Sequence, residues 1–98
     1  MSKQFGKYQL KSRYKGDKKM RVKFSTVEEV QNFAAKAGTM ESDITIHSGN
    51  RYIIDGKSLM GIFSLDLSSP LEIEFLEKKQ GEEEEFTKFC KAVGVMAE

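Results

Sequence analysis

Few residues in this chain have the type and spacing that catalysis requires. Its one histidine, His47, comes at the end of an alternating segment beside a turn, with no evident partner for metal binding or proton transfer. Glu72 and Glu74 alternate on a predicted strand and should both face solvent, which makes them a weak general acid and base pair. The single cysteine, Cys90, falls on the apolar stripe of a predicted helix, where a small core residue is expected. No metal or cofactor site is predicted.

The stretch with the most potential for chemistry begins at Ser58. Serine is a favourable helix N-cap, and the N–H groups and dipole at a helix start would accommodate a phosphate on its hydroxyl. An ordinary capping serine is the alternative interpretation. The apolar residues that follow point in nearly every direction around a helix of about two turns, so some of them should face water and form a contact surface. These residues are Leu59, Met60, Ile62, Phe63 and Leu65.

Alternation and capping signals predict the elements that position this stretch. Strands are expected at residues 20–24, 43–47 and 71–75, because apolar and polar residues alternate there. Another is expected at residues 51–54, which follow the hairpin turn signal Ser48-Gly49-Asn50. A capping box of Ser25 with Glu28, or of Thr26 with Glu29, begins a helix that ends at Gly38. Its buried stripe is predicted to be Val27, Val30, Phe33, Ala34 and Ala37. The run 82–85 supplies four acidic residues to the solvated first turn of a last helix.

The order of these elements defines a fold class. Strand, helix, strand, strand, short helix, strand and helix make an α+β protein, a two-layer open-faced sandwich of type βαββαβα. A four-stranded antiparallel sheet would carry the helices on one face, since nearly all polar strand positions fall on the other face. The length of 98 residues suits one such domain, predicted at residues 19–98.

Charge separates the beginning of the chain from the rest. Residues 1–24 hold nine basic residues against one acidic residue, although the whole chain has a net charge of only +1. Residues 1–18 are interpreted as a basic N-terminal arm, which either binds nucleic acid or an anionic surface or is simply solvated. No apolar run approaches a membrane span, and no disulfide framework is possible with one cysteine, so a cytoplasmic location is expected.

The block Lys57-Ser58-Leu59-Met60-Gly61-Ile62-Phe63-Ser64-Leu65 resembles the Lys-Ser-Ile-Met-Gly-Val-Met-Ser-Leu block of the HPr family. These proteins are phosphocarriers of the bacterial sugar phosphotransferase system, and their βαββαβα sandwich has the predicted element order. The resemblance covers about residues 19–95. It implies that Ser58 matches a serine phosphorylated by a dedicated kinase. It also implies that Leu59, Met60 and Phe63 match residues that dock on partner enzymes and regulators.

One part of the family pattern is missing. HPr proteins carry Gly-x-His-Ala-Arg-Pro between the first strand and the first helix, and this histidine accepts a phosphoryl group from phosphoenolpyruvate by way of enzyme I. Here Ser25 or Thr26 occupies the histidine position and Glu28 lies near the arginine position, where a carboxylate would repel a phosphoryl group.

The resemblance, together with the missing histidine motif, implies a regulatory, protein-binding member of the phosphotransferase system that has no catalytic residues. Its expected partners are proteins of that system or its regulators, together with an HPr-kinase-like enzyme acting on Ser58. An active phosphocarrier that uses His47 or another non-standard acceptor is the alternative.

Overall fold

A four-stranded antiparallel sheet organises the computed structural model, which describes residues 19–49 and 52–97. The strand order is β1-β4-β2-β3, so the first strand lies at one edge beside the last. Val22 at the end of β1 pairs with Leu71 at the start of β4, and Ile46 of β2 pairs with both Ile73 of β4 and Ile54 of β3. The strands are β1 (Lys19–Val22), β2 (Asp43–Ser48), β3 (Tyr52–Asp55) and β4 (Leu71–Leu76).

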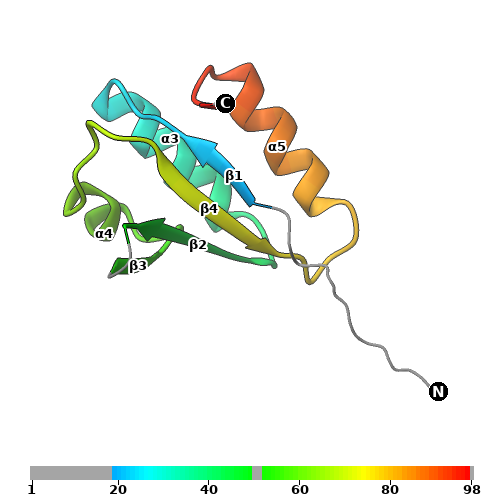
Figure 1. The fold of residues 1–98 in the computed structure, drawn as a ribbon. Coiled ribbons are helices and arrows are strands. Elements are labelled where there is room, and N and C mark those ends of the chain that lie inside the picture. The colour runs from blue at the N-terminus through cyan, green and yellow to red at the C-terminus, as the bar shows by residue number, and fades with distance from the viewer. Residues whose placement is uncertain (1–18, 50–51, 98) are drawn as a thin grey trace.

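Alternation along the strands gives the sheet one apolar face and one polar face. In β4, Leu71, Ile73 and Phe75 are buried, whereas Glu72 is exposed. The helices cover the apolar face, as Figure 1 shows, and they are α3 (Val27–Gly38), α4 (Leu59–Phe63) and α5 (Glu82–Ala92). The predicted fold class, an α+β two-layer open-faced sandwich of type βαββαβα, is therefore confirmed.

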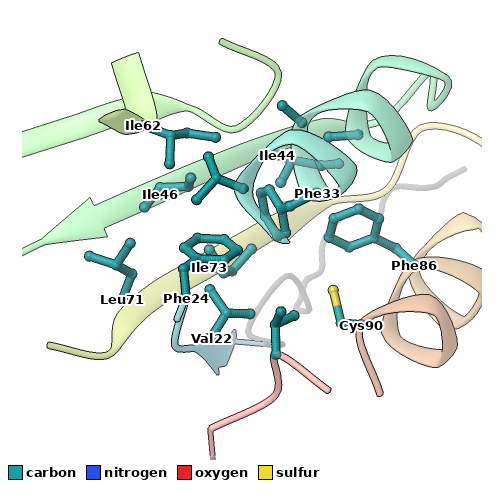
Figure 2. Close-up of a cluster of buried hydrophobic side chains, with 14 of the residues drawn as sticks. Val22, Phe24, Phe33, Ile44, Ile46, Ile62, Leu71, Ile73, Phe86 and Cys90 are labelled. Atoms are coloured by element: carbon teal, nitrogen blue, oxygen red, sulfur yellow. The ribbon is translucent and has the colours of Figure 1, made fainter. Parts of the chain in front are cut away.

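Aromatic and aliphatic side chains from both layers make the core (Figure 2). Phe33 of α3 and Phe86 of α5 meet edge to face, with ring centroids 5.1 Å apart. Ile62 brings α4 into the same cluster and is fully buried. Cys90 is also fully buried, which confirms that it is a core residue.

The start of α3 decides between the two predicted capping boxes and corrects the predicted burial of one residue. The N-cap is Thr26, whose Oγ1 accepts the N–H of Glu29 at 3.1 Å, and the overlapping box of Ser25 with Glu28 does not form. Val27 was predicted to be buried but is 60% exposed, because it occupies the first helical position beside the cap, outside the core. The rest of the predicted stripe is buried, namely Val30, Phe33, Ala34 and Ala37.

The end of the chain returns to the edge of the sheet. Helix α5 ends at Ala92, and Gly94 turns the backbone with a φ of 79°, a conformation that glycine adopts without strain. The segment 95–97 then bonds to β1: Lys23 donates its N–H to Val95 O at 2.8 Å, and Ala97 donates to Arg21 O at 2.8 Å. The outer edge of β1 is thus covered by the chain's own C-terminal segment.

Two predictions fall outside the described residues. The basic arm at residues 1–18 is one, and the turn residue Asn50 with the first predicted residue of the third strand, Arg51, is the other. Within 19–49 and 52–97, no helix is long and apolar enough to span a bilayer.

Candidate functional site

Helix α4 has the cap that the sequence predicts. Ser58 has an extended backbone and its Oγ accepts the N–H of Gly61 at 3.1 Å, while its carbonyl accepts the N–H of Ile62 at 3.0 Å. At the other end, the Ser64 hydroxyl donates to Gly61 O at 2.6 Å. These bonds pair N–H and carbonyl groups at both ends of α4. A helix of 5 residues is too short to be stable without its surroundings.

Close backbone contacts fix α4 on the sheet. Gly56 donates its N–H to Ile44 O at 2.7 Å, and a Cβ at this position would lie 2.8 Å from Ile44 Cγ2. A Cβ on Gly61 would lie 2.7 Å from Ile54 Cγ2, so β3 and α4 approach as closely as a glycine allows. Lys57 adds a tie to the chain after α3, because its Nζ donates to Met40 O at 2.9 Å.

The apolar residues of α4 divide between core and solvent. Ile62 is fully buried, Leu59 is half-buried, and Met60 is 78% exposed. Phe63 is 36% exposed, which is substantial for an aromatic ring on so small a domain. We call Leu59, Met60 and Phe63 the α4 patch. The expectation that this short helix could not bury all its apolar residues is confirmed.

The connection from β1 to α3 lies at the same end of the sheet as the segment that follows α4, because Val22 pairs with Leu71. Here the Glu29 carboxylate folds back over the helix start and accepts the N–H of Ser25 at 2.7 Å. The Thr26 hydroxyl is engaged with the N–H of Glu29. The Glu29 carboxylate thus lies against the backbone of Ser25, at the expected acceptor position, where its negative charge disfavours a phosphoryl group.

His47 lies on the polar face of the sheet, opposite the helices. It alternates with the buried Ile46, and its Nε2 is 3.1 Å from Glu74 Oε1 and 3.5 Å from Thr45 Oγ1. The sequence-based prediction that His47 has no partner was wrong. Glu74, which was predicted to face solvent, lies on the polar face of the sheet but is half-buried beside His47. The pair arises from the register of β2 against β4, which the sequence does not reveal. It does not bring His47 to the start of α3.

Sequence reasoning missed the role of Glu82. This residue was expected in a solvated acidic turn, yet it is only 6% exposed. Its carboxylate accepts the N–H groups of Glu41 and Ser42 and the Ser42 hydroxyl, at 2.7 to 3.1 Å. Burial alone would raise the pKa of Glu82, but these hydrogen bonds, with a contribution from Lys79, hold that pKa below its ordinary value. Glu82 thereby anchors α5 to the loop before β2.

The described residues offer no metal centre. Within 19–49 and 52–97, no three His, Cys, Asp or Glu side chains are grouped so that they could hold a metal ion. The chemistry available around α4 and the start of α3 is therefore that of hydroxyls, carboxylates and an exposed apolar surface, which suits protein binding and modification of a hydroxyl.

The fold resembles that of a solved phosphocarrier protein. The crystal structure of a phosphocarrier protein HPr from Bacillus anthracis str. Ames superposes with a TM-score of 0.55, at 23% sequence identity, over 76% of this chain and 92% of that chain. No family model and no curated protein matches the sequence. At this identity the likeness establishes the fold, and the HPr-like sandwich predicted from the sequence is confirmed.

Proposed function

We propose that this chain is an HPr-like protein of the sugar phosphotransferase system that acts by binding other proteins and not by carrying phosphohistidine. The α4 patch is the observation that carries the proposal. Met60 and Phe63 are exposed on an HPr-like fold, on a helix held rigidly to the sheet. An exposed, preorganised apolar patch with a large flexible methionine at its centre is typical of a protein contact surface.

The regulatory part of the proposal rests on what surrounds the acceptor position. Ser25 and Thr26 stand there without an imidazole. The Glu29 carboxylate accepts the Ser25 N–H, and the Glu29 N–H donates to the Thr26 hydroxyl. The chain's one histidine, His47, lies on the opposite face of the sheet and is paired with Glu74. Neither the residues at the start of α3 nor the position of His47 favours transfer of a phosphoryl group at the start of α3.

Ser58 is the proposed point of control, through phosphorylation by an HPr-kinase-like enzyme. Its side chain is half-buried and its Oγ already accepts the N–H of Gly61. A phosphate on this oxygen would add about two negative charges directly before Leu59 and Met60. Partners that dock on the α4 patch would then contact a negative charge at its edge, and their affinity for the patch would change.

The phosphocarrier alternative is tested by incubating the full chain with enzyme I and radiolabelled phosphoenolpyruvate. An HPr that retains its histidine is the positive control. We expect no acid-labile phosphate on this chain. Acid-labile labelling that disappears in a His47→Ala variant would instead establish His47 as the acceptor and overturn the proposal.

Docking is tested by NMR titration of the isotopically labelled chain with enzyme I and with a sugar transporter subunit. Shift changes should centre on residues 59–63. Met60→Asp should weaken binding about ten-fold or more, as expected for an anchor residue at the centre of an interface. Ile53→Asp is the matched control, because Ile53 is similarly exposed, at 66%, but lies on β3. Equal effects of the two substitutions would contradict docking through α4.

A further inference from the structure

A groove that the proposed function does not use runs between β1 and α5. Its volume is about 660 Å³, and Met20 of β1 and Phe75 of β4 contribute apolar side chains to it. The beginning of α5 and the preceding loop contribute carboxylates, namely Glu77, Glu83 and Glu84. The later part of α5 contributes Thr87, Lys88 and Lys91. One end of the groove is therefore acidic, and the other end is basic.

The chain that precedes β1 enters at the acidic end. Strand β1 runs parallel to α5, because Met20 lies 3.9 Å from the Thr87 hydroxyl in the middle of the helix, and Lys23 bonds to Val95 beyond its end. Continuing backwards from Met20 leads toward the first turn of α5, where Glu83 and Glu84 lie. Strand β1, which residues 1–18 precede in the sequence, therefore starts at the acidic end of the groove.

Charge and composition of residues 1–18 complement the groove. Six of the chain's 16 basic residues but one of its 15 acidic residues fall in this segment, so it carries +5 and residues 19–98 carry −4. The segment also contains apolar or aromatic residues that could cover the apolar part of the groove: Phe5, Tyr8, Leu10 and Tyr14. Because the segment is tethered, its effective concentration at the groove is in the millimolar range, so weak contacts suffice to hold it.

We propose that the groove between β1 and α5 is the docking site of the chain's own basic segment 1–18. The segment places its basic side chains against the carboxylates at the start of α5. This inference goes beyond the proposed function, because it concerns a surface away from α4. Its consequence is that the segment's positive charges are unavailable to anionic ligands while it is docked.

The test measures trypsin cleavage of the full chain after Lys11, Arg13 and Lys15 by mass spectrometry, normalised to a small trypsin substrate. Docking should protect these bonds. Glu84→Lys should speed cleavage about two- to five-fold, as should raising the salt from about 0.05 M to about 0.5 M. Gln80→Lys, which adds a positive charge to the groove without removing a carboxylate, should act in the same direction.

Glu28→Lys is the matched control. Glu28 and Glu84 are both in the first turn of a helix, so the two substitutions make the same change in net charge and in the interaction with the helix dipole. They differ in that only Glu84 lines the groove. Equal cleavage rates in all variants, insensitive to salt, would overturn the proposal. Protection that depends on protein concentration would also overturn it, because the groove would then hold the segment of a second copy.

Discussion

Replacement of Gly61 by alanine tests how closely α4 is fitted to the sheet. The new Cβ would lie 2.7 Å from Ile54 Cγ2 and 3.0 Å from Ser58 Oγ, both shorter than such contacts normally are. Neither neighbour can move freely, because Cγ2 is attached at the branch point of Ile54 and Ser58 Oγ caps the helix. Either α4 shifts away from β3, or its cap is lost.

The expected magnitude follows from three opposing contributions. Overpacking of this kind costs about 1–3 kcal/mol, and disturbing a serine N-cap costs about 1 kcal/mol. Alanine is favoured over glycine within a helix by about 1 kcal/mol, which offsets part of this loss. The free energy of unfolding should therefore fall by about 1–3 kcal/mol, and the melting temperature by at least about 4–8 °C for a domain of this size.

Gly38→Ala is the matched control for urea and thermal unfolding. Gly38 is also a helical glycine, but a Cβ there meets nothing within 4 Å, and its φ is not positive. The control should be neutral or more stable by up to about 1 kcal/mol. If Gly61→Ala proves as well tolerated as Gly38→Ala, the close approach of β3 to α4 is wrong, and so is the rigid patch.

Three further outcomes are expected. Ser58→Ala should lower the free energy of unfolding by about 1 kcal/mol, measured by urea denaturation, whereas Ser58→Asp should retain most of the cap. Glu82→Gln should be less stable than the parent chain at about pH 7, and the difference should narrow at about pH 3. The lowered pKa of Glu82 means that its stabilising contribution is present above its ordinary pKa of 4.5 and is lost as the pH falls through the lowered pKa. Burial raises the pKa of the Cys90 thiol to about 12, so a thiol reagent at mildly alkaline pH should label Cys90 only after denaturant is added.

Local signals in the sequence were sufficient for the elements and for α4. Alternation placed three of the strands, and a turn signal placed the fourth. Ser58 before an apolar run marked a helix whose apolar residues exceed what it can bury. The start of α3 was ambiguous, because Ser25 and Thr26 each head a possible capping box and only one can form. Periodicity also assigned the exposed Val27 to the buried stripe. This error arose because helical periodicity does not show which part of a helix extends beyond the sheet.

The remaining errors concern contacts between residues distant in sequence. Glu82 bonds to a loop 40 residues earlier, and nothing distinguishes it from the three glutamates that follow it. His47 meets Glu74 because β2 and β4 pair in one particular register, which depends on the whole sheet. Such pairings become visible only when the strands are placed side by side.

The C-terminal segment along β1 has a consequence for synthesis of the chain. Both neighbours of β1 come late in the sequence: β4 begins at Leu71, and the segment that bonds to its outer edge is residues 95–97. On a ribosome, β1 is made first among the described strands, yet it has no hydrogen-bonding partner until most of the domain has been synthesised. Its outer edge is completed only when residues 95–97 have emerged, so β1, the first of the described strands to be made, is protected from pairing with another chain only after the other three strands have been made.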